Sequence, residues 1–242
     1  MRIPRVFCAE TIPGPGSLEL GPDSAHYLGK VLRMSAGRAL ILFDGSGGEY
    51  PAEIESLAKS SVVVSVGEKS SVDRESPLQV EMAIGISRGD RFDWVLQKAT
   101  ELGVARIAPL FTERVEVKLS GERLQKKIDH WRQVIISACE QSQRTSIPNL
   151  CTPQSLSSWL ESSSADVGLV LHHRTAQQLS SWQTPPQSVR LLIGPEGGLS
   201  DDEIQRAEAC GLSPLSLGPR VLRTETAPIA ALSVLQFQWG DF

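Results

Sequence analysis

The sequence predicts an α/β protein, in which a small antiparallel β unit precedes a mostly parallel sheet with helices on its faces. Beyond residue 77, apolar strand-like runs alternate with segments of helical periodicity, the order that builds a parallel sheet. Before residue 69, short β-rich runs are separated by turns at residues 44–48 and 59–61, which indicates antiparallel pairing. The polar stretch at residues 69–77 separates the two patterns, so we expect two domains.

Strands of the parallel sheet are predicted at five short, mostly apolar runs. These runs span residues 80–86, 105–110, 167–171, 189–193 and 215–217. Between the first two, Asp90 is a candidate N-cap and Gly103 a stop signal, with apolar side chains at helical spacing between them. A longer helix with a single apolar stripe is predicted at residues 122–143.

The composition is that of a globular protein with an ordinary core, since 40% of residues are apolar and 21% are charged. No run approaches the ~20 apolar residues of a membrane span, and prolines interrupt the N-terminus before a signal peptide could develop. A cytoplasmic location without membrane attachment is therefore expected. The four cysteines form no CxxC pair, so neither a disulfide framework nor a metal site is predicted.

The net charge of −4 argues against a protein that holds nucleic acid by bulk electrostatics alone. Charge is nevertheless uneven along the chain. Residues 86–146 hold 11 Lys and Arg against 8 Asp and Glu, whereas residues 147–242 hold 5 against 9. Solvated helix faces produce asymmetries of this size, so the distribution does not by itself indicate a partner.

A glycine-rich segment, GPEGG at residues 194–198, follows the strand predicted at residues 189–193. Ser200 and Glu203 then form a capping box for a helix that begins at Asp201. Glycines at the carboxyl end of a parallel strand let the backbone approach a ligand closely, and open α/β sheets bind ligands at that edge. The segment matches neither GxGxxG nor GxxxxGK[ST], so the familiar nucleotide sites are not indicated, and a plain tight turn is the alternative.

A second loop of the same design, LGPRVLRTETA at residues 217–227, follows the next predicted strand. Thr226 is a candidate N-cap for a helix over residues 227–238. Arg223 and Glu225 would then lie beside backbone N–H groups that favour an anion. For Arg223, a salt bridge to a nearby carboxylate is the simpler alternative. Two such loops at neighbouring strand ends together predict a small-cofactor site.

The chain resembles a known family over nearly its whole length. The residues that carry the resemblance are Ile3-Pro4-Arg5, His26-Tyr27-Leu28, Val31-Leu32-Arg33, Leu42-Phe43-Asp44-Gly45, residues 88–103, Glu140-Gln141-Ser142, and the loops GPEGG and LRTETA. The family comprises the bacterial enzymes that methylate N3 of one uridine in 16S ribosomal RNA, the RsmE family of the SPOUT (trefoil-knot) methyltransferases. The resemblance implies a PUA-like β-barrel over residues 1–72, a knotted SPOUT-type α/β domain over residues 73–242, and a homodimer.

The resemblance also implies that S-adenosylmethionine lies bent among three loops. The residues expected to contact it are Leu171, His172, Ile193, Gly194, Pro195, Glu196, Gly197, Gly198, Leu217, Gly218, Leu222, Arg223, Thr224, Thr226 and Ala227. Arg223 and Glu225 are the expected catalytic residues. Arg223 would stabilise the uridine anion, Glu225 would orient the base or accept its proton, and Glu196 would balance the cationic sulfonium.

RNA contacts are expected from a small set of basic side chains. Phosphate contacts are predicted for Arg2, Arg5, Lys30, Arg33 and Arg91, with Lys98 as a further candidate. For Arg91 and Lys98, a solvated helix face is the alternative. An acidic protein with so few contacts should bind bare RNA weakly, so 16S RNA within an assembled small subunit is the expected substrate.

Two other classes of protein stay open from the sequence. One is a flavodoxin-like enzyme that binds a phosphorylated nucleotide at the same edge of the sheet. The other is a non-catalytic RNA-binding protein that uses its β unit, although such a protein would not require the two loops.

Overall fold

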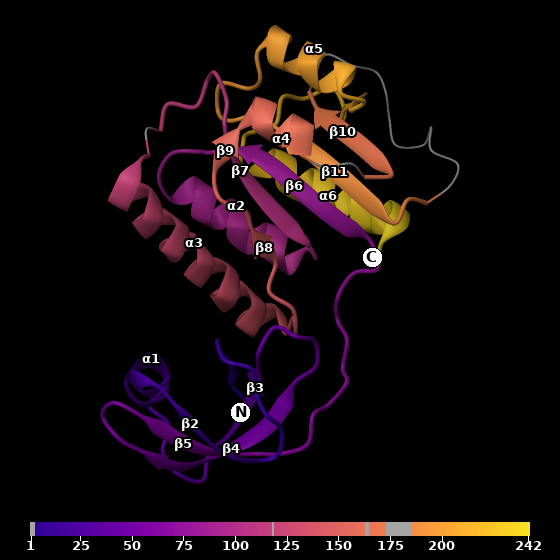
Figure 1. Ribbon diagram of the computed structural model, residues 1–242. Helices are drawn as coiled ribbons and strands as arrows, with labels where there is room; N and C mark the ends of the chain where they lie inside the picture. Colours follow the sequence, from indigo (N-terminus) through magenta and orange to yellow (C-terminus); the bar gives the residue numbers. More distant parts are fainter. Residues whose placement is uncertain (1–2, 118, 163–164, 173–184) are drawn as a thin grey trace. The chain divides into compact units, whose positions relative to one another are not determined.

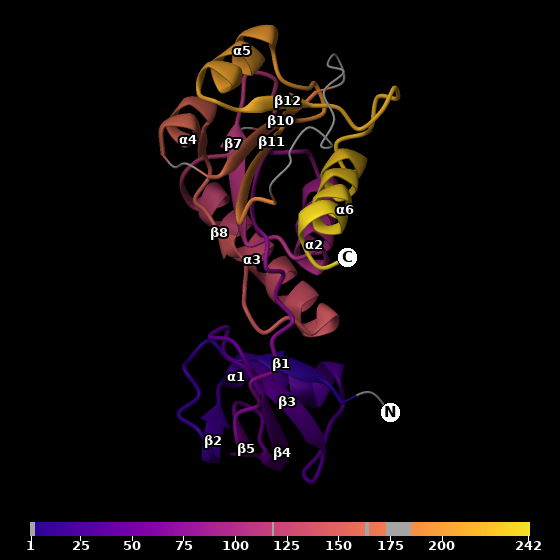
Figure 2. The ribbon, with the colours of Figure 1, turned by 90° about the vertical axis from the view of Figure 1, so that its right-hand side faces the viewer.

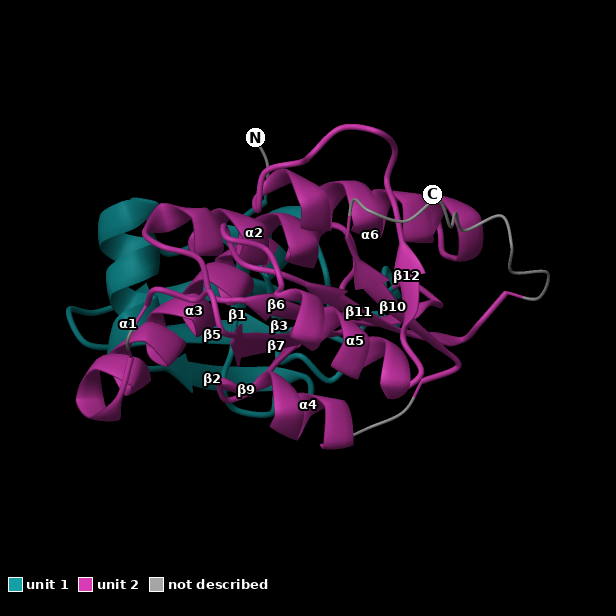
Figure 3. Cartoon of the chain, turned by 90° about the horizontal axis from the view of Figure 1, so that it is seen from above, with its two compact units in different colours: residues 1–75, 139–147 teal, residues 76–138, 148–242 magenta. Residues whose placement is uncertain are grey.

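The computed structural model describes residues 3–117, 119–162, 165–172 and 185–242. Contacts between residues divide the chain into two compact units (Figure 3). Unit 1 comprises residues 1–75 and 139–147, and unit 2 comprises residues 76–138 and 148–242. The chain therefore leaves unit 1, builds the first part of unit 2, and contributes a short second segment to unit 1 before it returns.

Unit 1 is built on a five-stranded sheet. In the order β1-β3-β4-β5-β2, its strands are β1 (Arg5–Phe7), β3 (Ala39–Phe43), β4 (Tyr50–Leu57), β5 (Val62–Val66) and β2 (Gly16–Leu20). A short helix, α1 (Pro22–His26), continues into a π-helical turn, η1 (Tyr27–Val31), after β2. The predicted antiparallel unit is confirmed for every strand pair except β1 with β3, which run parallel.

Alternating burial along β4 shows why one face of this sheet packs against the core of unit 1. Tyr50, Ala52 and Ile54 are buried, while Pro51 and Glu53 between them are exposed. A strand has a side-chain period of two, so this pattern turns one face of the sheet toward the core of unit 1. The apolar face therefore follows directly from the local sequence.

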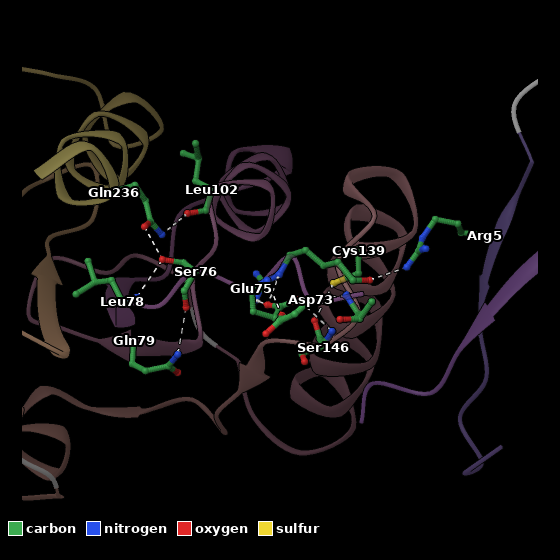
Figure 4. Close-up of polar contacts among 12 residues, drawn as sticks. Arg5, Asp73, Glu75, Ser76, Leu78, Gln79, Leu102, Cys139, Ser146 and Gln236 are labelled. Carbon is green, nitrogen blue, oxygen red and sulfur yellow. Dashed lines mark hydrogen bonds and ion pairs between the residues drawn. The ribbon is translucent and has the colours of Figure 1, made fainter. Parts of the chain in front are cut away.

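Polar contacts attach the second segment of unit 1 to the first. The Phe7 backbone N–H donates to Oε1 of Glu140 at 3.0 Å. Nε of the buried Arg144 donates to Oε2 of Glu75 at 2.9 Å, and the Thr145 N–H donates to the other oxygen of Glu75 at 3.1 Å. Glu75 also accepts from the Ser146 N–H at 3.2 Å, and Figure 4 shows these two residues close together.

Unit 2 contains a seven-stranded sheet. Its strands are β6 (Gln79–Gly85), β7 (Arg106–Phe111), β8 (Asn149–Leu150), β9 (Gln154–Ser155), β10 (Val167–Leu171), β11 (Ser188–Ile193) and β12 (Ser213–Leu215). The order is β12-β10-β11-β6-β7-β8, and β9 also pairs with β7. All pairings between these strands are parallel, which confirms the predicted sheet type.

Helices cover both faces of this sheet (Figure 1). They are α2 (Asp90–Glu101), α3 (Gly121–Ser142), α4 (Leu156–Ser162), α5 (Asp201–Ala209) and α6 (Thr226–Trp239). Figures 2 and 3 show α2 and α6 on one face and α4 and α5 on the other. Within the part of the chain that is described, no helix is both long and apolar enough to cross a membrane.

Two helix caps differ from the prediction. Asp90 is the first residue of α2 rather than its N-cap, a position that Gly89 takes with a φ of 60°. Glu225 is the N-cap of α6, and no side chain caps this helix, so the prediction for Thr226 is wrong. Instead, the backbone N–H groups of Thr226 and Ala227 both donate to the Arg223 carbonyl at 2.9 Å. A tight backbone turn thus replaces the expected side-chain cap.

The last strand of the sheet is also shifted from its predicted place. We predicted it at residues 215–217, whereas β12 covers Ser213–Leu215. Its second residue, Pro214, lacks a backbone donor and is tolerated here because β12 is the edge strand of the sheet. The apolar run that suggested a strand continues instead into the loop that follows.

Candidate active site

A cavity of about 510 Å³ lies in unit 2 at the carboxyl ends of β10, β11 and β12. It is formed by residues 171–172, residues 193–199 and residues 217–227, with further side chains from the neighbouring loops. Cavities that bind small ligands commonly measure about 300–1,000 Å³, so this one is large enough for a cofactor. It lies at the edge of the sheet where the sequence predicted a ligand site.

Nearly all of the residues predicted to contact a cofactor line this cavity. The exception is Thr226, which begins α6 and is exposed. Sequence reasoning missed Arg114, Leu199, Ile204, Arg220 and Val221, which also line it. Arg220 and Val221 belong to the predicted second loop and could have been included by position, whereas Arg114 comes from a different part of the chain.

Close backbone packing shapes the turn at residues 194–199. A Cβ added to Gly194 would lie 2.7 Å from the Leu199 backbone nitrogen, too close for any side chain. A Cβ on Gly85, at the end of β6, would lie 2.6 Å from the Pro195 ring. The Gly198 N–H donates to the Pro195 carbonyl at 2.8 Å, which closes the turn. Packing therefore requires glycine at positions 85 and 194, whereas Gly198 has open space around it and a φ of 68° that favours glycine.

The predicted capping box at the start of α5 is confirmed. Ser200 Oγ accepts from the Glu203 N–H at 3.2 Å, and Glu203 Oε2 accepts from the Ser200 N–H at 2.9 Å. The Glu203 side chain has a second partner, because its Oε1 accepts from the Glu113 N–H at 2.9 Å. One buried carboxylate therefore joins the end of the turn to the loop that follows β7.

Glu196 is held by the loop that follows β6. Its Oε1 accepts from the Arg88 backbone N–H at 2.9 Å and lies 3.5 Å from Nη1 of Arg91. One third of the Glu196 side chain is exposed, and Arg91 also lines the cavity. Glu196, which we expected to balance a cationic ligand, therefore already lies close to the positive charge of Arg91.

The second loop, residues 217–227, presents Arg223 and Glu225 to the cavity. Arg223 is exposed, while Glu225 is partly buried at the N-cap of α6. Among the residues whose positions are described, no carboxylate forms an ion pair with Arg223, so the simpler alternative of a local salt bridge has no support. Both side chains are placed to meet a ligand.

The side chains predicted to contact RNA fall into different environments. Arg2 lies outside the described residues. Arg5 is only 6% exposed and pairs with Glu49, so its guanidinium is not available for the predicted phosphate contact. Lys30 and Arg33 are both exposed in unit 1.

In unit 2, the two predicted RNA contacts on α2 already have acidic partners. Arg91 lies beside Glu196, as described above. Lys98 donates to Glu101 at 2.8 Å, one turn along the same helix. The first pair is largely exposed and the second is partly buried, and ion pairs that solvent reaches are weak, so both cations can exchange partners. In the described ranges, no three His, Cys, Asp or Glu side chains gather into a group that could hold a metal ion.

Comparison with known families identifies two matching domains. An RNA methyltransferase domain matches residues 74–236, and an RNA methyltransferase PUA domain matches residues 20–67. The chain is 31% identical to ribosomal RNA small subunit methyltransferase E of Buchnera aphidicola, covering all of this chain and 96% of that protein. It is 34% identical to the protein of that name in Bacillus subtilis, covering 89% and 88% of the two chains.

Two solved structures share the whole fold. One, from Legionella pneumophila, was solved with the bound cofactor SAM; it is 44% identical and superposes with a TM-score of 0.96 over all of both chains. The other is a ribosomal RNA small subunit methyltransferase E from Neisseria gonorrhoeae bound to S-adenosylmethionine, which is 34% identical with a TM-score of 0.93, again over both full chains.

Proposed function

The chain belongs to the ribosomal RNA small subunit methyltransferase E family, and on that premise we propose that it methylates N3 of one uridine in 16S ribosomal RNA, with S-adenosylmethionine as the methyl donor. The observation that carries the proposal is the cavity at the ends of β10, β11 and β12, in a fold whose relatives were solved with this cofactor. The strand ends and the two loops together form the wall of this site.

The residues present fit this cofactor. The cavity volume suits a nucleoside-sized ligand, and Gly194 and Gly198 keep side chains out of the turn that borders it. The wall combines apolar side chains such as Leu171 and Leu222 with the charged side chains of Glu196 and Arg223. We propose that the apolar part holds the adenosine and the charged part holds the amino acid end.

The cofactor supplies an activated methyl group, so the protein has to align the acceptor and deal with its proton. Alignment of the two reactants can lower the barrier by roughly 7–11 kcal/mol in favourable cases. N3 of uridine is protonated at neutral pH, and a positioned base contributes about 10²–10⁴-fold. We propose that Glu225 orients the base or accepts this proton and that Arg223 stabilises the anion that forms.

RNA recognition is proposed to use both parts of the chain. Residues 1–72 would form the PUA-like RNA-binding domain and residues 73–242 the catalytic domain. The exposed Lys30 and Arg33 support phosphate contacts by the first, and Arg91 at the cavity supports contacts by the second. The uridine has to leave its stack to reach the cavity, which costs a few kcal/mol and favours an exposed target.

The family further suggests a trefoil knot in the catalytic domain, a cytoplasmic location and a homodimer. Exposed apolar residues on α6 and after it support the homodimer, because Phe237 is 75% exposed and Phe242 is 60% exposed. Large exposed apolar side chains of this kind commonly mark protein interfaces. Light scattering coupled to gel filtration measures the oligomeric state, and a monomer at micromolar concentration would contradict the homodimer.

The proposed activity is tested on small ribosomal subunits purified from cells that lack this protein. Incubation with S-adenosylmethionine should introduce one methyl group per subunit, which mass spectrometry of the RNA nucleosides should locate on N3 of uridine. Methylation of another base, or none at all, would overturn the proposal. Calorimetry with S-adenosylhomocysteine and with mononucleotides distinguishes it from a flavodoxin-like nucleotide site.

A further inference from the structure

We propose that Arg114 is a positioning residue that holds the turn at residues 194–199 in the form that binds the methyl donor. Arg114 lies just beyond β7 and was not identified by any sequence motif. Its Nη1 donates to the Gly197 carbonyl at 2.8 Å and lies 3.3 Å from the Leu199 carbonyl, and the side chain lines the cavity. The inference rests on the proposed function, because it assigns the donor to this cavity.

A guanidinium suits this task better than another donor would. Its N–H groups have fixed directions, and its charge strengthens the hydrogen bonds to both carbonyls. The two acceptors are two residues apart, so bonds to both hold the backbone from Gly197 to Leu199 in one arrangement. Glu196 fixes the first part of the same turn from the β6 side, as described above, which leaves Arg114 to fix the second part.

Packing provides an independent sign that this side chain lies against the turn. A Cβ added to Gly197 would lie 3.0 Å from Cβ of Arg114 and 3.3 Å from its Cδ. The atoms nearest to that Cβ all belong to Arg114. The need for glycine at position 197 is therefore explained by the arginine that lies across it.

The base of the Arg114 side chain is itself anchored. The preceding residue, Glu113, donates its N–H to Oε1 of Glu203, whose other oxygen accepts from the Ser200 N–H. Glu203 is 1% exposed, so this bridge is shielded from water. These hydrogen bonds join the loop after β7 to the start of α5, and Arg114 extends from this anchored loop to the turn.

Loss of Arg114 should weaken binding of the donor more than it weakens catalysis or RNA binding. Arg114→Ala removes charge-assisted hydrogen bonds, which corresponds to about a 10- to 100-fold weaker affinity. Arg114→Lys should recover part of this loss, because an ammonium keeps the positive charge and the N–H donors but lacks the fixed N–H directions of the guanidinium. The KM for S-adenosylmethionine should rise, while the KM for the ribosomal subunit and kcat should change little.

The test measures S-adenosylhomocysteine binding to the full chain by calorimetry. Arg206→Ala is the matched control, because Arg206 pairs with Glu113 at 3.2 Å but does not line the cavity. The control should bind within about twofold of the wild type, as expected for an exposed ion pair. Thermal unfolding of each variant verifies that the fold is intact. Wild-type affinity in Arg114→Ala would overturn the proposal.

A double-mutant cycle with Gly197→Ala tests the contact itself. Gly197→Ala should weaken binding in the wild type and cost less in an Arg114→Gly background, because this background removes Cβ of the arginine, the atom nearest to the added methyl group, together with Cγ and Cδ. Additive effects would overturn the proposal. If the wild type binds S-adenosylhomocysteine and Arg114→Ala does not, yet subunits remain unmethylated, only the proposed function fails. If subunits are methylated and Arg114→Ala binds normally, only the role of Arg114 fails.

Discussion

At the scale of single residues, the second loop places two opposite charges at the edge of one cavity. Arg223 and Glu225 are two positions apart in the chain, and both line the site. The Arg223 carbonyl also accepts the N–H groups of Thr226 and Ala227, so the backbone of the loop is tied to the start of α6. Substitution of either side chain leaves these backbone bonds in place.

Because the backbone bonds of the loop do not depend on these two side chains, substitutions of Arg223 and Glu225 test their roles in catalysis. Arg223→Ala and Glu225→Gln should each lower the methylation rate on subunits by about 10²-fold, because the uridine loses an anion partner or a base. Single-turnover methylation at saturating S-adenosylmethionine measures the effect, and S-adenosylhomocysteine calorimetry separates a loss of cofactor affinity, which is expected for Arg223→Ala, from a loss in the chemical step. Full activity in both variants would remove the proposed roles.

At the scale of elements, a buried ionic cluster connects β1 to the rest of unit 1. Glu49 accepts from Arg5, which is almost fully buried, and from Arg74 at 3.1 Å. Burial by itself would raise the pKa of Glu49, but the hydrogen bonds and positive charges of the two arginines outweigh it, so the pKa lies below its usual value. A carboxyl with a lowered pKa stabilises the folded state when it is ionised.

Because the pKa of Glu49 is lower in the folded state than in the unfolded chain, protonation of Glu49 destabilises the folded state. The stabilisation is complete above the unfolded-state pKa, about 4.3, and is lost as the pH falls through the lower folded-state value. Glu49→Gln should therefore flatten the loss of stability in acid. It should also destabilise unit 1 by about 3–5 kcal/mol at neutral pH, because Arg5 keeps a buried charge without its partner. Hydrogen exchange of β3, β4 and β5 over a pH series measures both effects, and unchanged profiles would contradict them.

A buried amide on α6 joins three elements of unit 2. Gln236 is fully buried; its Oε1 accepts from the Ser76 hydroxyl at 2.7 Å, and its Nε2 donates to the Leu102 carbonyl at 2.9 Å (Figure 4). These bonds connect α6 to the residue after α2 and to the segment before β6. Both polar atoms of the side chain are therefore satisfied within the core.

Replacement of this amide should cost stability. Gln236→Leu leaves the Leu102 carbonyl buried without its partner, at a cost of about 1–3 kcal/mol. Gln238→Leu makes the same change at an exposed position of the same helix and should stay within about 0.5 kcal/mol of the wild type. Urea unfolding monitored by tryptophan fluorescence compares them, and equal stability of the two variants would contradict the role of Gln236.

At the scale of the whole molecule, RNA binding has to come from a few cations on an acidic chain. The log of the affinity should fall linearly with the log of the salt concentration. Lys30→Ala and Arg33→Ala should each reduce that slope by about one if each contacts a phosphate. Lys59→Ala, an exposed lysine between β4 and β5, is the control and should leave the slope unchanged.

The same scarcity of cations predicts a preference for an assembled substrate. Methylation of intact small subunits should proceed with a higher kcat/KM than methylation of a short bare RNA of the same sequence. A side-by-side assay at fixed salt measures this. Equal turnover on the two substrates would contradict the prediction.

Local signals in the sequence predicted most of the strands and helices and the two loops, but not β8, β9 or α4. Mostly apolar runs marked β6, β7, β10 and β11, because a strand buried on both faces carries few polar positions. The capping box joins Ser200 to Glu203, three positions further along the chain, and was correctly predicted. Arg5 was not, because its partner Glu49 is 44 positions away and no local pattern connects them.

By itself, then, the sequence determined where most of the strands and helices lie and which two loops border a ligand site, since periodicity, caps and turn residues act within a few positions of the chain. Only the tertiary structure decided the strand order, the inclusion of residues 139–147 in unit 1 and the placement of Arg114 across Gly197. These features depend on pairing and burial between segments far apart in the chain, which the packing of the whole fold decides and no local pattern encodes.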